Sequence, residues 1–179
     1  MNHFRRIAHY DVRSLKAALA ENAARWGDNT FRQDHPLSPH PNSETIFLRW
    51  APGPVTAQSV LENLDVVDLE LGRRPPFSTA IHSIASFADG RPARAIIVKM
   101  HPGGSIKRHI DEGKYAEATD RFHLPIQTNP DAWLRIGDEC AHLDEGEIWW
   151  FDKHSPHDGG NDGAADRIHL IVDVFRDPL

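Results

Sequence analysis

From Arg94 onward the sequence consists of short apolar runs separated by turn-forming residues, and this alternation constrains the fold more than any other feature. The runs lie at residues 95–100, 105–110, 121–126, 132–136, 141–143, 147–151 and 168–175. Clusters of Gly, Asn, Asp and Pro separate them. Seven or eight short strands within about eighty residues predict a jelly-roll sandwich or barrel, because closely spaced turns leave only short antiparallel strands to pair.

The first half of the chain has a different pattern, in which helices and loops dominate. Apolar residues recur at helical spacing between Asp11 and Trp26, and Gly27 follows as a stop signal. Further elements are expected at residues 27–43 (long loop), 45–50 (strand), 56–64 (helix, with Thr56 as a candidate cap) and 76–87 (helix). We therefore expect a single domain over residues 1–179 that is mainly β with N-terminal helices. Residues 1–93 form a helical and loop buttress, and residues 94–179 form the jelly-roll core.

Composition excludes several classes of partner. The formal net charge is −6 and no clustered basic face is evident, so a nucleic acid partner is not expected. No apolar run approaches the roughly 20 residues needed to span a bilayer, so we expect no membrane partner. The lone Cys140 excludes an internal disulfide and a multi-thiolate metal site. We expect a cytoplasmic protein in which Cys140 is a buried small side chain.

The triplet His109-Ile110-Asp111 is the main chemical motif. Residues i and i+2 of a strand point to the same face, so His109 and Asp111 can reach one metal ion while Ile110 packs behind them. A distant second histidine, His157, would complete a triad of two nitrogens and one carboxylate oxygen. Such a triad leaves one side of the ion open and fits Fe(II) better than a structural zinc, which is normally closed by four ligands. An isolated His-x-Asp also occurs by chance as a surface pair.

The chain has twelve histidines, so each candidate ligand has rivals. Five lie outside the predicted barrel strands and are interpreted as solvated or locally hydrogen-bonded: His3, His9, His35, His40 and His82. Four others are plausible alternatives to the chosen ligands: His101, His142, His154 and His169. His154 and His157 share one loop or strand entry, and we expect only one of them to reach the metal. His157 is chosen for its spacing to Arg167.

From His101 to Leu179 the sequence resembles the aspartyl/asparaginyl β-hydroxylase family, which includes 2-oxoglutarate-dependent hydroxylases of protein side chains and of free amino acids. The matching segments are residues 109–111, 121–126, 146–152, His157, Arg167 and 170–174. The resemblance implies that His109, Asp111 and His157 ligate Fe(II), which reacts with O2. It further implies that Arg167 pairs with the distal carboxylate of the co-substrate 2-oxoglutarate. Arg121 and His123 match positions that line the co-substrate pocket.

Two of these assignments have simpler alternatives. Arg121 alternates with Phe122 and would otherwise be an exposed strand arginine. His123 would otherwise be a core histidine bonded to a backbone carbonyl. Some members of the family lack the carboxylate ligand, whereas this chain has Asp111 and so resembles the members with a full triad that act on small substrates.

The expected substrate is a free amino acid or a small peptide-like molecule, because the chain is short and lacks an extra substrate-binding domain. The segment 27–40, with Asn29, Arg32 and Gln33, together with Arg49, would cover the open metal face and hold a carboxylate. The alternative is a solvated loop with Arg49 at a strand end. Other functions stay open: a hydroxylase of protein Asp or Asn side chains, a metal-dependent cupin enzyme that does not use 2-oxoglutarate, or a non-catalytic jelly-roll binding module.

Overall fold

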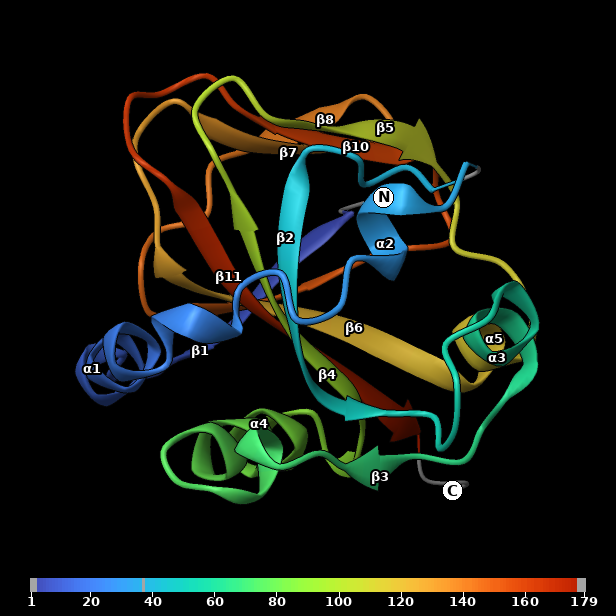
Figure 1. Ribbon diagram of the computed structural model, residues 1–179. Helices are drawn as coiled ribbons and strands as arrows, with labels where there is room; N and C mark the ends of the chain where they lie inside the picture. Colours follow the sequence, from blue (N-terminus) through green and yellow to red (C-terminus); the bar gives the residue numbers. More distant parts are fainter. Residues whose placement is uncertain (1–2, 37, 177–179) are drawn as a thin grey trace.

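The computed structural model describes residues 3–36 and 38–176, which form two facing antiparallel sheets (Figure 1). The major sheet has the order β1 (Phe4–His9), β9 (Glu147–Phe151), β6 (Thr119–Gln127), β11 (Arg167–Arg176), β4 (Gly90–Met100), β2 (Ser43–Trp50) and β3 (Val67–Asp68). The minor sheet has the order β5 (Ser105–His109), β10 (His157–Asn161), β7 (Ala132–Ile136) and β8 (Glu139–Ala141). The predicted jelly-roll class is confirmed.

Helices cover the outer face of the major sheet and one edge of the barrel. The helices are α1 (Arg13–Glu21), α2 (Phe31–Asp34), α3 (Ala57–Glu62), α4 (Phe77–Phe87) and α5 (Lys114–Ala118), with short 3-10 turns at Ala23–Arg25 and Leu71–Arg73. Figure 1 shows α1 and α4 on the side of the major sheet that faces away from the minor sheet. The largest core cluster lies there, where Leu15 of α1 and Ile81 of α4 pack against Leu124 and Leu170 of the sheet. Burial of this apolar face holds the helices in place.

Two central strands have apolar side chains on one face and polar side chains on the other. In β11, Leu170, Val172 and Val174 belong to the helix-side core, and in β6, Phe122, Leu124 and Ile126 do the same. Because strand side chains alternate between faces, the intervening residues point between the two sheets. These include Arg121, His123, Arg167, His169 and Asp173. The period of two therefore brings five polar residues into the interior of the barrel.

The first half contributes more to the sheet than expected. Residues 1–93, predicted to form helices and loops around one strand, supply β1, β2 and β3 to the major sheet. Strand β1 was not predicted, because its six residues include two arginines and a histidine and it lies at the sheet edge, half exposed, beside β9. The long loop 27–43 contains the short helix α2, and residues 114–118 form the unpredicted α5.

Strand β10 was also missed, because its sequence His-Asp-Gly-Gly-Asn has no apolar side chain. Its five residues are nonetheless all buried between β5 and β7. Gly160 is required there, since a Cβ atom would lie 2.7 Å from the indole ring of Trp133. The predicted burial of Cys140 is wrong: this residue is exposed on the edge strand β8.

The predicted cap of α3 is confirmed. Thr56 Oγ1 accepts a hydrogen bond from Ser59 N–H at 3.0 Å, and Thr56 N–H donates to Ser59 Oγ at 2.9 Å. The helix is shorter than the predicted 56–64 and ends at Glu62. This cap matters for the site, because α3 forms one wall of the cavity described below.

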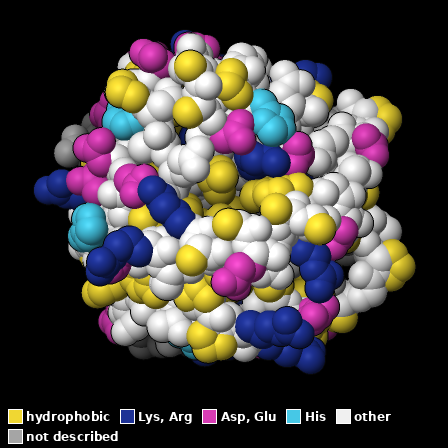
Figure 2. Space-filling model, turned by 60° about the vertical axis from the view of Figure 1, so that its left-hand side comes forward, with side chains coloured by type: hydrophobic (Ala, Val, Ile, Leu, Met, Phe, Trp, Pro, Cys, Tyr) yellow, Lys and Arg dark blue, Asp and Glu magenta, His cyan; other side chains and the backbone are white. Residues whose placement is uncertain are grey.

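The surface mixes charges of both signs. On the face drawn in Figure 2, basic and acidic side chains are interspersed around an apolar hollow. Within residues 3–36 and 38–176, no helix combines the length and the apolar character needed to cross a bilayer.

Candidate metal centre and its cavity

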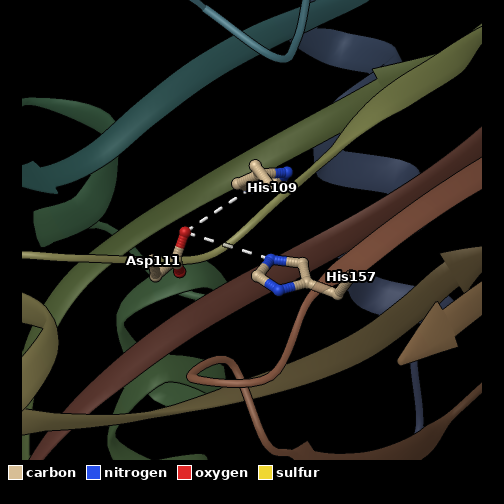
Figure 3. Close-up of side chains that lie close together, drawn as sticks. All are labelled: His109, Asp111 and His157. Atoms are coloured by element: carbon tan, nitrogen blue, oxygen red, sulfur yellow. Dashed lines mark ion pairs between the residues drawn. The ribbon is translucent and has the colours of Figure 1, made fainter. Parts of the chain in front are cut away.

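Two paired strands of the minor sheet bring three ligand-type side chains together. His109 is the last residue of β5 and His157 the first of β10, and the two are register partners. Asp111 follows two residues after β5, and its N–H donates to the Lys153 carbonyl at 3.2 Å. Figure 3 shows the three side chains pointing toward one another. One ligand atom from each lies within 4.8 Å of the others.

The distances suit a shared ion. Asp111 Oδ1 lies 3.5 Å from His109 Nε2 and 3.9 Å from His157 Nε2. Two ligands at about 2.1 Å from one ion are roughly 3.0 Å apart at a right angle and about 4.2 Å apart when opposite. Both observed separations fall between these limits, so only small side-chain movements are needed to bind an ion.

Backbone carbonyls orient both imidazoles. His109 Nδ1 lies 2.7 Å from the Lys107 carbonyl oxygen, and His157 Nδ1 lies 3.0 Å from that of Ser155. A carbonyl only accepts, so each Nδ1 carries the proton and each Nε2 presents its lone pair to the centre. Burial, partly opposed by Asp111, lowers the pKa of His157 to about 4. His157 is therefore neutral at pH 7, as a metal ligand must be.

The carboxylate of Asp111 is divided between two tasks. Oδ1 faces the histidines, whereas Oδ2 accepts a hydrogen bond from Arg121 Nη1 at 2.5 Å. Burial alone would raise the pKa of Asp111, but Arg121 and the two histidines outweigh it and hold that pKa well below its usual range. The side chain is thus an anion with one oxygen committed to Arg121 and one free for a cation.

Two of the four rival histidines lie on the surface, away from this cluster. His101 bridges Glu44 and Asp166 at 2.7 and 2.8 Å on the surface, and His154 is exposed. One detail of the motif is wrong: Ile110 does not pack behind the ligands but is 42% exposed at the rim of the cavity. Because β5 ends at His109, the chain no longer alternates as a strand at Ile110.

Among the described residues, the side-chain partner of Arg167 is a neutral histidine. Arg167 is buried, and its guanidinium contacts His169, with Nε 3.1 Å from His169 Nε2 and Nη2 3.2 Å from His169 Nδ1. Burial lowers the pKa of Arg167 to about 10, so it remains a cation at pH 7. No described carboxylate lies within ion-pairing distance of it. Arg167 is therefore a desolvated cation without a described counter-ion.

Arg121 lies on β6, the strand next to the β11 strand that carries Arg167, and each of its three guanidinium nitrogens donates a hydrogen bond to a carboxylate. Its Nε and Nη2 donate to the two oxygens of Asp173, its cross-strand partner, at 2.8 and 3.0 Å, while Nη1 reaches Asp111. These carboxylates raise the pKa of Arg121 despite its burial. The structure thus connects Arg121 to the candidate ligand Asp111, and Asp173 anchors the guanidinium from β11.

His123 lies between the surroundings of Arg167 and the candidate metal ligands. Its ring packs edge-on to Phe151 at 4.9 Å between centroids, and its Nδ1 lies 3.2 Å from His169 Nδ1. Phe151 in turn contacts the ring of His157 at 5.4 Å. Burial, reinforced by Arg167, keeps the pKa of His123 well below its ordinary value. A chain of packed rings therefore connects the Arg167 region to the candidate metal ligand His157.

A cavity of about 370 Å³ opens beside His109 and Asp111. This is within the size range of small-molecule sites. Its lining includes residues that the sequence did not single out for the site: His40, Trp50, Lys153 and Asp173. Asp173 was detectable, because it lies on the same strand face as Arg167. The others were not, since their proximity depends on how distant segments pack.

The predicted covering segment does border this cavity. Arg32, Ser38 and His40 line it together with His109. His40, expected to be solvated or locally bonded, packs its ring edge-on to His109 at 5.3 Å. Arg49, in contrast, is engaged by Asp68 and by the Ala93 carbonyl, and it is not among the lining residues.

Comparison with known proteins shows where this architecture occurs. A family model described as aspartyl/asparaginyl beta-hydroxylase matches residues 61–177. An L-proline cis-4-hydroxylase from Rhizobium meliloti (strain 1021) is 31% identical over 77 residues, which cover 43% of this chain and 28% of that protein. The match thus spans less than a third of the relative's length.

Solved structures share the fold over nearly the whole chain. A Pseudomonas putida prolyl-4-hydroxylase superposes with a TM-score of 0.62 at 14% identity, covering 98% of this chain and 94% of that one. An oxidoreductase of the 2OG-Fe(II) oxygenase family from Burkholderia pseudomallei superposes with a TM-score of 0.59 at 12% identity, covering 98% and 85%. The family match over well over half of the residues decides the classification: this chain belongs to the aspartyl/asparaginyl β-hydroxylase family.

Proposed function

We propose that this chain is an Fe(II)- and 2-oxoglutarate-dependent hydroxylase that acts on a C–H bond of a free amino acid or a small peptide-like substrate. Arg167 is the observation that carries the proposal. A buried guanidinium whose side-chain partner among the described residues is one neutral histidine, His169, is costly unless an anion joins it, and its planar fork matches a carboxylate. It lies close to β10: a Cβ atom at Gly159, two residues after the ligand His157, would be 3.8 Å from Arg167 Nη1.

The donor set fits Fe(II). Two neutral Nε2 atoms and one carboxylate oxygen converge, and the cavity borders His109 and Asp111. When bound, Fe(II) with 2-oxoglutarate supplies O2 activation. The substrate C–H bond and 2-oxoglutarate each give two electrons to O2. One oxygen atom enters the hydroxyl group of the product and the other enters succinate, with loss of CO2.

The chain's own residues position and insulate the reactants. Arg167 holds the distal carboxylate of 2-oxoglutarate, and the neutral His123 and His169 beside it keep the pocket free of competing cations. Arg121 and Asp173 fix Asp111 so that only one of its oxygens is available to the metal. Apolar walls that include Trp50 and Ile171 limit the water around the open side.

Succinate release tests the proposal. The protein is incubated with Fe(II), ascorbate and 2-oxoglutarate across a panel of free amino acids and of Asp- and Asn-containing peptides, and succinate and hydroxylated product are quantified together. One succinate per product supports the proposal. Turnover of a substrate without succinate formation would favour a metal-dependent cupin enzyme, and turnover restricted to Asp- or Asn-containing peptides would favour a protein side-chain hydroxylase. A folded, iron-loaded protein that forms no succinate with any of these substrates would contradict it.

A further inference from the structure

The cavity beside the metal ligands contains four cationic side chains, and three of them have partners. Arg94 donates to the carbonyls of Ser59, Val60 and Asn63 at 2.6 to 2.8 Å and so holds the end of α3. Arg121 is bound by two carboxylates, and the Lys153 ammonium group donates to Thr119 Oγ1 at 2.7 Å. The fourth cation, Arg32, differs from these three.

The guanidinium of Arg32 has no hydrogen-bond or ion-pair partner among the described residues. Its Nη1 is shielded from solvent without a hydrogen-bond partner, and no carboxylate of the described residues forms an ion pair with it. Arg94 and Lys153 also have no carboxylate partner, but carbonyl and hydroxyl oxygens hold them, although Arg94 Nε is likewise buried without a partner. Burial, together with the nearby charge of Arg121, lowers the pKa of Arg32 to about 10, so it stays charged at pH 7. An unpaired buried donor is destabilising, and an anion in the cavity would relieve this cost.

The segment that carries Arg32 is fixed to the metal-binding strand. Ser38 Oγ donates to the Arg32 carbonyl, and the N–H of Lys107 on β5 donates to the Pro39 carbonyl at 2.9 Å. The ring of His40 then packs on His109, the last residue of β5. These contacts hold Arg32 at a defined position relative to the candidate ligands, as a substrate anchor requires.

Apolar side chains form a large part of the cavity walls, and the carboxylates of Asp111, Glu112 and Asp173 also line the cavity. Trp50, Ile96 and Ile171 belong to one buried cluster on the inner face of the major sheet, and Val60 packs against it. Leu61 and Ile110, both about 42% exposed, lie at the rim. A cavity with one unpaired cation and apolar walls is complementary to a small molecule with one carboxylate and an apolar body.

We propose that Arg32 binds the carboxylate of the substrate, and that the substrate is a free amino or imino acid with a small apolar side chain. The inference rests on the proposed function and adds to it the substrate class and the residue that selects it. Arg32 and Arg167 then divide the two anions: Arg167 binds the co-substrate and Arg32 binds the substrate.

Ligand binding tests this independently of turnover. Binding of L-proline, L-valine and L-leucine, and of their carboxamides, is measured by anaerobic calorimetry on protein loaded with Mn(II) and 2-oxoglutarate. At least one acid should bind about 30-fold or more tightly than its amide, because the amide cannot form the ion pair. Arg32→Met should weaken binding of that acid by a similar factor and leave the amide nearly unchanged, and Arg32→Lys should restore part of the loss.

Arg13→Met is the matched control, because Arg13 is exposed and pairs only with Asp11 on the surface. It should leave acid binding unchanged, and the melting temperature of each variant shows that the fold is intact. Equal affinities for acid and amide, or full acid binding in Arg32→Met, would overturn the inference. Tighter, Arg32-dependent binding of an Asp-containing peptide would overturn the assigned substrate class.

The two proposals fail differently. Substrate-dependent succinate release that is unaffected by Arg32→Met removes the anchor and leaves the proposed hydroxylase in place. Arg32-dependent binding of an acid without succinate release under any condition removes the hydroxylase and leaves the anchor.

Discussion

Arg121 and Arg167 enter the barrel interior from neighbouring strands, β6 and β11, but their surroundings are opposite. Arg121 has a carboxylate on each side, Asp111 and Asp173, whereas Arg167 contacts one neutral imidazole, that of His169. Burial lowers the pKa of Arg167, while the two carboxylates raise that of Arg121. The difference separates two uses of one side chain: Arg121 completes a protein network that positions the candidate ligand Asp111, whereas Arg167 binds the co-substrate carboxylate in the proposed function.

Replacement of Arg167, the arginine without a described carboxylate partner, should have the largest effect on ligand binding. In Arg167→Met the affinity for 2-oxoglutarate should fall by about 2–5 kcal/mol, or roughly 30-fold at the lower end, because a buried charge pair is lost. Affinity for the metal should change little. Calorimetric titrations of Mn(II) and then of 2-oxoglutarate measure both quantities. A wild-type affinity for 2-oxoglutarate in the variant would place the anchor elsewhere.

Replacement of Arg121, which is paired with two carboxylates, should reduce metal affinity more than 2-oxoglutarate affinity. Arg121→Met removes the hydrogen bond to Asp111 Oδ2 and raises the pKa of Asp111, so affinity for the metal should fall by about 10- to 100-fold, the range for loss of an outer-shell partner. The effect on 2-oxoglutarate binding to metal-saturated protein should be smaller. If the variant instead loses mainly 2-oxoglutarate affinity, Arg121 acts on the co-substrate directly and the contrast with Arg167 disappears.

The pH dependence of stability provides a third test. The pKa of His157 is about 4 in the fold against 6.5 for an ordinary histidine, so the unfolded chain binds more protons between these values. The metal-free protein should therefore lose stability as pH falls, by about 2 kcal/mol from this group between pH 7 and pH 5. Urea unfolding of the wild type and of His157→Gln at pH 7 and pH 5 isolates the contribution of His157. The difference in free energy of unfolding between the two proteins should be smaller at pH 5 than at pH 7. A pH-independent difference would mean that His157 is not held neutral.

The smallest effect serves as a control for stability. Thr56→Ala removes the cap of α3, which lines the cavity, and should lower the free energy of unfolding by about 1 kcal/mol. Metal and 2-oxoglutarate affinities should stay at wild-type values under native conditions. If this variant reproduced the binding losses of either arginine variant, those losses would report general destabilisation rather than the contacts described here.

Strand alternation explains how much of this site was predictable. Arg167 and Asp173 share a face of β11 because they are an even number of residues apart. His109 and Asp111 converge as predicted, but not by this rule, because β5 ends at His109 and the N–H of Asp111 is bonded to the Lys153 carbonyl. Pairing with Asp173 gives Arg121 its role and depends on the register between β6 and β11, which one sequence does not reveal. Strand β10 lacks the apolar signal, so its ligand His157 was chosen from its spacing to Arg167 rather than from a recognised strand.

In the fold, too, features with a local sequence signal were predicted and features without one were missed. The runs after Arg94 predicted the jelly roll, because their apolar pattern and turn residues are local signals. Strand β1 and helix α2 were missed, since one is a charged edge strand and the other has only four residues. The position of Arg32 beside His109 follows from a backbone hydrogen bond between Pro39 and Lys107, two residues far apart in sequence. Sequence patterns thus predicted the elements that have strong local signals, whereas contacts between distant segments determined the cavity.

Crystals grown anaerobically with Fe(II) offer the most direct test, through an anomalous difference map at the iron edge. We predict one strong peak bonded to His109 Nε2, His157 Nε2 and one oxygen of Asp111, with the other Asp111 oxygen still bound to Arg121. A map with no peak at these three residues, or with the ion held instead by the surface cluster of His101, Glu44 and Asp166, would contradict the account.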